Sequence, residues 1–553
     1  MFLINTLRSS IKVALLGGAS PETKGTVKRT DQFTQFALLV IPPQLINQIK
    51  DGASTNEDII AKDIDLGWEK VGDGSGNICW VESNVKEMVV KVSDKFSFII
   101  LKEDDSYALY PASLTLIGKF FASKIIYPLR DKIEFAETNE QAATIFKEVK
   151  LSEALPDSYH TWTDMLTDEN FSRIFFNGMG VVLLDGAEEE NVELGPYLVD
   201  MPLQNFETRQ GFRPYGARIH FDDDQSVTAI FDYHKKKLYR RGDDGWARAK
   251  FVAKSSMITL VTAREHLVYS HLLLSNSTTR HSTVILSPSH PIRRLLTIFI
   301  HRTNTVNFNA VNTLVPENSL LHRGTGFEYK ALVEVFESSF ESCNIFQPFP
   351  TRKIHPSLIA LSQEGKLPYI SEGIEYYDIV KNFVKRWLDE AGEAANDDKA
   401  KAFYEAMQED TKGQSYELPD FESEDSMVNL ISQIIFVVTA WHELVGGVVD
   451  YVSLPSQCGF RIAEDESHID VDLQSYFLMG LVGASTSIRM PFLMRSFKNF
   501  FGKGVGQEWE VTVWGDFLAA LVKQSVAVKV ADAKRSVEFK TFDPENFECS
   551  VSV

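Results

Sequence analysis

The hydrophobic and polar positions of the chain repeat mainly with the period of an α-helix. Apolar residues at every third or fourth position lie on one face of a helix. A period of two, typical of strands, runs through GARIHFDDDQSVTAIFDYHKKKLYRRGDDGW, residues 216–246, with turn signals at DDD and GDDG. We therefore expect a small antiparallel sheet between about residues 210 and 250. Helices are predicted over residues 253–275, 290–314, 374–391, 424–450, 472–482 and 511–530.

These elements predict a mainly α protein, one large helical domain over residues 1–553 with a small antiparallel β subregion. No internal repeat or low-complexity linker divides the chain, although its length would allow two or more domains. Residues 1–150 mix helical periodicity with a glycine-rich interruption at VGDGSGN, and we expect an N-terminal helical part of the same domain. The acidic stretch 391–402 is predicted to be a solvated loop between helices.

Composition narrows the class of function. The chain is 44% hydrophobic and 24% charged, which is ordinary for a soluble globular protein. A formal net charge of −20 disfavours a surface that follows phosphates, so nucleic acid is not an expected partner. The cysteines Cys79, Cys343, Cys458 and Cys549 are scattered without a CxxC pair, which argues against a disulfide framework or a zinc ribbon.

The sequence shows no clear targeting or membrane-spanning segment. Its beginning, MFLINTLRSSIKVALLGGAS, has only short apolar runs broken by polar residues, unlike a secretory signal. No uncharged apolar run approaches the roughly 20 residues that span a bilayer. We expect a cytoplasmic monomer, or one loosely associated with membranes.

Two histidines lie five residues apart in the stretch REHLVYSH, residues 264–271. On a regular α-helix each residue advances about 100°, so His266 and His271 would lie about 140° apart and could not share one ion. A π-type turn, which closes between residues i and i+5, would bring both rings to one side. One core and one surface histidine is the commoner outcome for such a pair. A shared metal site therefore predicts a π-type turn here.

A third histidine, His442, is centred in the apolar segment SQIIFVVTAWHELVGGVVDY, residues 432–451. A long buried helix has little use for an imidazole unless it is hydrogen-bonded or bound to a ligand. His442 is therefore a candidate metal ligand, although a hydrogen-bonded core histidine is again commoner. His281 and His290 remain alternative ligands.

At these residues the sequence resembles the lipoxygenases, non-haem iron dioxygenases of polyunsaturated fatty acids. The family's first ligand helix carries two histidines separated by four residues, as His266 and His271 are. Further matches follow the family order from about residue 160 to the last residue. They are TDENFSRIFFNGMG (167–180), HPIRRLL (290–296), HRTNTVNFNA (301–310), LPYISEGIEYYDIVKNFVKRWL (367–388) and FDPENFECSVSV (542–553).

The resemblance implies a lipoxygenase-like catalytic domain without the separate N-terminal β-barrel of plant and animal relatives. It implies four metal ligands, which are His266, His271, His442 and the terminal carboxylate of Val553. Imidazole and oxygen ligands together suit iron or manganese. A terminal valine also occurs in a manganese-containing fungal branch, but the spacing of the first two histidines resembles the iron enzymes. We expect iron, with manganese as the alternative.

One position departs from the family pattern. The family usually has an asparagine ligand four residues after its third histidine, where this chain has Gly446, which offers no side-chain ligand. Val311 and Leu321 lie near segments that line the substrate cavity of relatives, and they are candidates for the substrate-binding wall. Ordinary core packing explains both residues equally well.

The chemistry that the resemblance implies is hydrogen abstraction from a doubly allylic methylene by a metal-bound hydroxide. Addition of O2 then gives a hydroperoxide, and the protein has to position the polyunsaturated fatty acid in an apolar cleft. No acid–base side chain is required beyond the hydroxide. Gly446, together with the segment 272–289, which is shorter than expected of the family, motivates a second possibility, another oxidative step such as hydroperoxide isomerisation or desaturation. A third is a non-catalytic relative that binds lipid.

Overall fold

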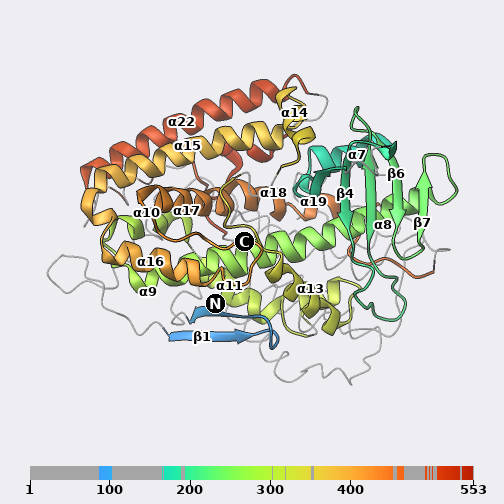
Figure 1. The fold of residues 1–553 in the computed structure, drawn as a ribbon, viewed down its shortest axis with the longest axis horizontal. Helices are drawn as coiled ribbons and strands as arrows, with labels where there is room; N and C mark the ends of the chain where they lie inside the picture. The colour runs from blue at the N-terminus through green and yellow to red at the C-terminus, as the bar shows by residue number, and fades with distance from the viewer. Residues whose placement is uncertain are drawn as a thin grey trace, which may run out of the picture.

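The protein is a body of long helices with a small sheet at one end (Figure 1). The computed structural model describes residues 86–102, 165, 167–187, 193–301, 303–317, 319–349, 354–452, 457–465, 492–494, 497, 501, 507–535 and 539–551. The longer helices are α7 (Asp168–Phe176), α8 (Trp246–Leu260), α9 (Asn276–Ile285), α10 (Pro291–Phe299), α11 (Thr303–Thr313), α13 (Tyr329–Glu341), α14 (Pro356–Gln363), α15 (Pro368–Ala391), α16 (Asp398–Glu409), α17 (Glu424–Phe436) and α22 (Glu508–Asp532). Shorter helices are α12 (Leu320–Gly324), α18 (His442–Gly446) and α19 (Val449–Val452), with 3-10 turns at Met179–Leu183, Gly392–Ala395, Lys540–Phe542 and Pro544–Asn546. Two π-helices, η7 (Val261–Ser275) and η9 (Val437–Trp441), complete the helical elements in these ranges.

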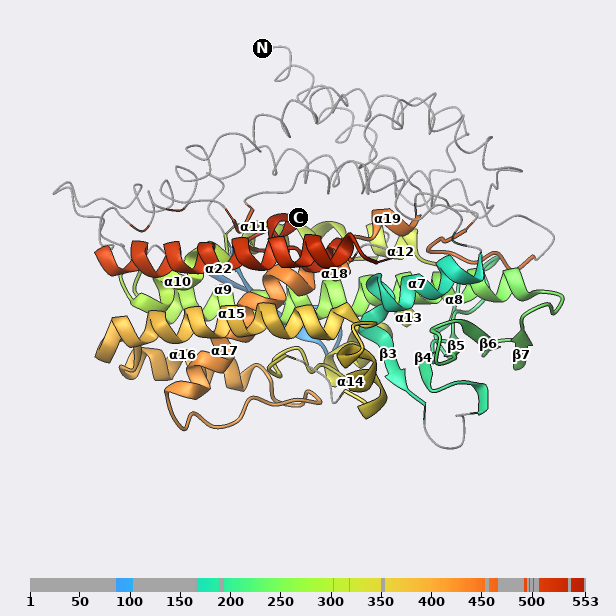
Figure 2. The same cartoon turned by 90° about the horizontal axis from the view of Figure 1, so that it is seen from above.

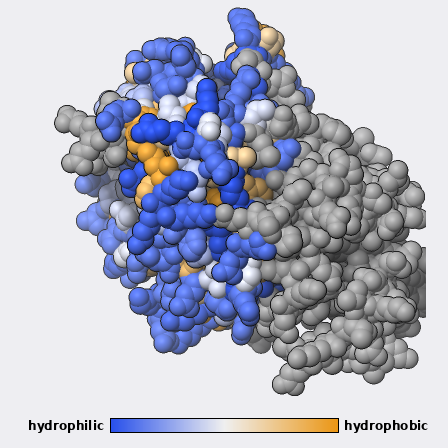
Figure 3. All heavy atoms as spheres, turned by 90° about the vertical axis from the view of Figure 1, so that its right-hand side faces the viewer, coloured by the Kyte–Doolittle hydropathy of each residue, from blue (hydrophilic) through white to orange (hydrophobic). Residues whose placement is uncertain are grey.

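The sheet is a five-stranded antiparallel meander. Its strands, in spatial and chain order, are β3 (Leu184–Gly186), β4 (Tyr197–Met201), β5 (Ala217–Phe221), β6 (Val227–Asp232) and β7 (Lys237–Arg240). The alternating pattern between residues 210 and 250 is thereby confirmed as sheet, with two more strands upstream. Helices α7 and α8 pack against it, which covers its apolar side chains, and the molecular surface at this end is mainly hydrophilic (Figure 3).

Two continuous helical segments cross the interior and carry the three candidate histidines. One runs from α8 through η7 into α9, because the residues that follow each boundary keep right-handed helical dihedrals. The other runs from α17 through η9 into α18, and most of its residues are buried. Helices α15 and α22 lie side by side along the outside in both views, with the rings of Phe383 and Phe517 stacked 4.1 Å apart (Figures 1 and 2).

Several predicted boundaries differ from the observed ones. The predicted helix 290–314 is two helices, because the chain turns at Ile300, which has φ −112° and ψ 8° and ends α10. The predicted helix 424–450 ends at Gly446, since Gly447 departs from helical dihedrals with ψ 35°. The expected loop 391–402 is mostly helical, because Asp397 caps α16 by accepting hydrogen bonds from the N–H groups of Lys399 and Ala400.

Two expectations fall largely outside the described residues. The predicted helix 472–482 lies outside them entirely. Within residues 1–150, the described part is an antiparallel hairpin of β1 (Lys86–Lys91) and β2 (Ser97–Lys102), where we expected helix. Apolar Phe98 and Ile100 on β2 are buried, so this hairpin contributes to the main core.

Two described helices are long and apolar enough to cross a membrane by length and composition alone. They are Glu424–Gly446 and Glu508–Asp532, which our count of uncharged runs did not identify. The apolar window of the first is 89% buried and that of the second 39%. The first is a core helix that carries His442, so its apolar character follows from its place inside the protein.

Candidate functional site

The predicted π-type turn between His266 and His271 is present. Residues Val261–Ser275 form a π-helix of 15 residues. The wider turn is stabilised at its C-terminal end, where the carbonyl of His271 accepts from the N–H of Asn276 and from Ser275 Oγ at 3.0 Å. Ser270 Oγ also donates to the carbonyl of Glu265 at 2.8 Å. Both imidazoles therefore project to the same side of one helix.

His442 is brought to the same point by a second π-helix. The segment Val437–Trp441 immediately precedes it, and α18, which begins at His442, packs against η7. Thr439 in this segment bonds the hydroxyl of Tyr376 on α15 at 2.8 Å, which ties the π-helix to its neighbour. His271 and His442 are buried, whereas His266 is partly exposed.

The three Nε2 atoms form a nearly equilateral triangle. They are 3.1 Å apart for His266 and His442, 3.2 Å for His266 and His271, and 3.1 Å for His271 and His442. With metal–ligand bonds of about 2.1 Å, neighbouring ligands are about 3.0 Å apart around an octahedral ion and about 3.4 Å apart around a tetrahedral one. The observed spacing lies between these two values, so the triangle is compatible with three imidazoles bound to one ion. In the described part of the chain, no other group of three or more His, Cys, Asp or Glu side chains is arranged to hold an ion.

Asn307 on α11 fixes the tautomer of His271. Its Nδ2 donates to the His271 carbonyl at 2.8 Å, so its Oδ1 must face His271 Nδ1, which lies 3.1 Å away. Nδ1 then carries the proton and donates it, which leaves the lone pair of His271 Nε2 directed at the other two imidazoles. Asn307 is fully buried. Asn307 lies in the segment 301–310 that resembles the family, but the sequence does not predict its contact with His271, because nothing local marks a partner 36 positions away.

We expect Asn307→Leu to weaken metal binding by about 10- to 100-fold, because the tautomer and ring orientation of His271 would no longer be fixed. The measurement is a competition titration of the metal-free chain with a chelator of known affinity. Asn304→Leu is the matched control, since Asn304 is also buried on α11 but donates to the Leu101 carbonyl instead. Equal metal affinities in the two variants would contradict this role.

The other predicted ligand positions have different outcomes. A Cβ atom on Gly446 would lie 3.5 Å from His266 Nε2, so this position does face the triangle, as its place four residues after His442 predicts. Val553 lies outside the described residues, and its role as a ligand stays a prediction. The tail before it is buried at Cys549, Ser550 and Val551, and Ser550 Oγ donates to the His301 carbonyl at 2.7 Å.

The two alternative metal ligands, His281 and His290, lie apart from the triangle. His281 Nε2 bonds Asp410 at 2.8 Å, and His290 Nε2 lies 3.3 Å from Asp397, so neither joins the metal group. Burial lowers the pKa of His290 despite the opposing effect of that carboxylate. Val311 is buried on α11 and Leu321 is half-buried on α12. Their predicted contact with substrate stays a prediction.

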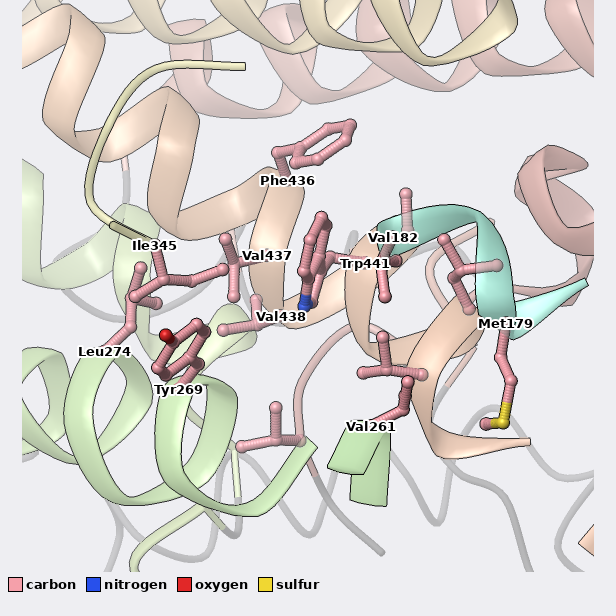
Figure 4. Close-up of a cluster of buried hydrophobic side chains, with 14 of the residues drawn as sticks. Met179, Val182, Val261, Tyr269, Leu274, Ile345, Phe436, Val437, Val438 and Trp441 are labelled. Carbon is pink, nitrogen blue, oxygen red and sulfur yellow. The ribbon is translucent and has the colours of Figure 1, made fainter. Parts of the chain in front are cut away.

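Apolar side chains surround the two π-helices. Figure 4 shows Val261, Tyr269 and Leu274 from the first segment facing residues of the second. The others drawn with labels are Met179, Val182, Ile345, Phe436, Val437, Val438 and Trp441. Such an environment lowers the local dielectric beside the π-helices. A separate surface cavity of about 750 Å³, lined by residues that include Gln204, Glu317 and Tyr329, contains none of the predicted site residues.

Comparison with known proteins gives matches in structure but not in sequence. No protein-family profile matches the chain, and no curated protein sequence matches it. Among solved structures, coral 8R-lipoxygenase superposes with a TM-score of 0.68 at 14% identity, covering 91% of this chain and 83% of that one. A lipoxygenase from the fungus Fusarium graminearum gives a TM-score of 0.65 at 15% identity, covering 89% and 99%. An anaerobic structure of a lipoxygenase in complex with arachidonate gives 0.66 at 14%, covering 91% and 83%.

Proposed function

We propose, from the lipoxygenase-like fold of this chain, that it is a non-haem metal dioxygenase that inserts O2 into a polyunsaturated fatty acid to give a hydroperoxide. The observation that carries the proposal is the triangle of Nε2 atoms at 3.1–3.2 Å. If Nε2 is unprotonated on all three rings, three unshared electron pairs face one point, and a cation between them would remove their mutual repulsion. The arrangement is therefore best explained as a metal site.

His266, His271 and His442 would hold the metal, and the terminal carboxylate of Val553 is the proposed fourth ligand. We infer iron, with manganese as the alternative, because the spacing of His266 and His271 resembles that of the iron lipoxygenases and because imidazole and oxygen ligands together suit either ion. A redox-active ion bound there would supply the one-electron oxidation that removes hydrogen from a doubly allylic methylene.

The remaining tasks belong to side chains of the protein. Asn307 keeps the His271 lone pair directed inward, and the bonds of Ser270 and Ser275 hold the π-helix that aligns the pair. The buried apolar side chains around the π-helices would exclude water from the centre (Figure 4). The arachidonate complex of a lipoxygenase with the same fold supports a fatty acid as the substrate.

The test is an oxygen-electrode measurement with linoleate and with arachidonate, run beside metal analysis of the same sample. We expect about one iron per chain, and oxygen uptake matched by formation of a conjugated diene. An iron-loaded protein that takes up no oxygen with either acid would contradict the proposal.

Gly446 favours a second candidate function on the same metal. Because this position lacks a side-chain ligand, the second candidate is a divergent enzyme that catalyses another oxidative step, either hydroperoxide isomerisation or desaturation. Consumption of a linoleate hydroperoxide without oxygen uptake would identify this activity. A metal-free protein that binds fatty acid without turnover would instead identify a lipid-binding relative.

A further inference from the structure

Gly446 lies beside the imidazole triangle, where an added Cβ atom would meet no clash. It is the last residue of α18, one helical turn after His442, so both residues project to the same face. A Cβ atom at this position would lie 3.5 Å from His266 Nε2 and 3.8 Å from His442 Cε1, which are ordinary van der Waals distances. Gly446 does not have a positive φ. Neither the backbone nor the space therefore requires glycine here.

Because glycine has no side chain, position 446 contributes no electron-pair donor to the metal position. The imidazoles occupy one face of the inferred coordination sphere, so further ligands must approach from the opposite side. No fourth described His, Cys, Asp or Glu side chain joins the three histidines. An amide or hydroxyl at position 446 would start from a Cβ 3.5 Å from His266 Nε2, within reach of an ion bound to that nitrogen.

We propose that the position opened by Gly446 binds a small external ligand, an anion or a diatomic molecule, directly on the metal and next to His266. The inference rests on the proposed function, because it requires an ion between the three imidazoles. Gly446 thereby makes the centre sensitive to small anions, and a donor side chain at the same position would block that sensitivity.

The test uses the full chain loaded with cobalt(II), whose visible spectrum reports its ligands, and titrates it with azide. Three proteins are compared: the unmodified chain, Gly446→Asn, which adds a donor, and Gly446→Ala, which adds only a Cβ. We expect azide to change the spectrum of the unmodified chain. Gly446→Asn should weaken azide binding about tenfold or more and strengthen cobalt binding, whereas Gly446→Ala should stay within about twofold for both. Gly446→Ser, with a smaller donor, replaces Gly446→Asn if that variant does not fold.

Each result separates the inference from the proposed function. Equal azide binding by the unmodified chain and by Gly446→Asn would overturn the inference, as would no azide binding by the cobalt-loaded chain. A loss in Gly446→Ala as large as that in Gly446→Asn would also overturn it, because bulk and not a donor would then be the cause. A chain that binds no cobalt at all would contradict the proposed function itself.

Discussion

Replacing His442 with alanine should remove most of the bound metal and, with it, oxygen uptake. The Nε2 atom of His442 lies 3.1 Å from both other imidazole nitrogens, so its loss leaves two donors where three define the coordination face. We expect metal affinity to fall by about 100-fold or more, since truncating a ligand costs at least as much as losing its hydrogen-bonded support. Metal analysis after dialysis and the oxygen electrode measure the two effects.

The structure offers matched controls for this substitution. His281 and His290 are also buried, but they bond Asp410 and Asp397 instead of the metal group. His281→Ala and His290→Ala should therefore keep full metal content, whatever they do to stability. His442→Gln, which retains a polar side chain in the core, checks that metal loss does not follow from unfolding. Iron retained in full by His442→Ala would exclude His442 as a ligand.

A two-residue extension after Val553 should abolish activity and weaken metal retention. We propose the carboxylate of Val553 as a ligand, and an extension would move that charge away and place extra peptide in its position. The preceding tail is anchored in the core, since Phe547 packs on the Tyr376 ring at 4.9 Å and Cys549 Sγ bonds the Ile298 carbonyl at 3.2 Å. These contacts offset the roughly 10 kcal/mol of backbone entropy that ordering such a tail costs.

A second modification separates the effect of losing the terminal charge from the effect of adding residues. Converting the terminal carboxylate of Val553 to a carboxamide by semisynthesis removes the charge and adds no residue. We expect this form to lose metal affinity as the extended chain does, and the same extension placed before Met1 to lose none. Full turnover and iron content in the extended chain would exclude the tail as a ligand and leave the three histidines as the protein's own donors.

The sequence predicts which helices and strands form better than it predicts where they begin and end. Periodicity finds the strands around Ile219, and long apolar segments find the helices that carry His266 and His442, which are buried on nearly all sides. It misses the turn at Ile300, since no glycine or proline marks it and only packing decides where the chain bends. It also misses the helical start at Asp398, because the acidic residues that indicate solvent exposure serve there as a helix cap.

The candidate site was also predictable only in part from the sequence. The spacing of His266 and His271 alone required a π-type turn if they were to share an ion, and the structure contains one. That His442 joins them follows from the family resemblance and not from periodicity, since no local pattern links residues 171 positions apart. Asn307 could not be found in this way, because its amide acts on His271 through a contact that only the tertiary structure creates.

The π-helix Val261–Ser275 limits how this centre could be reused in protein design. Its geometry depends on partners outside the octapeptide REHLVYSH, among them the Asn307 amide that holds the His271 carbonyl. If the same eight residues were grafted into an unrelated helix, we expect them to form a regular α-helix, in which the two imidazole rings would point about 140° apart. A transplanted centre therefore has to bring α11 as well as the helix that carries His442, so the unit that a designer can move is a set of three packed helices and not a linear motif.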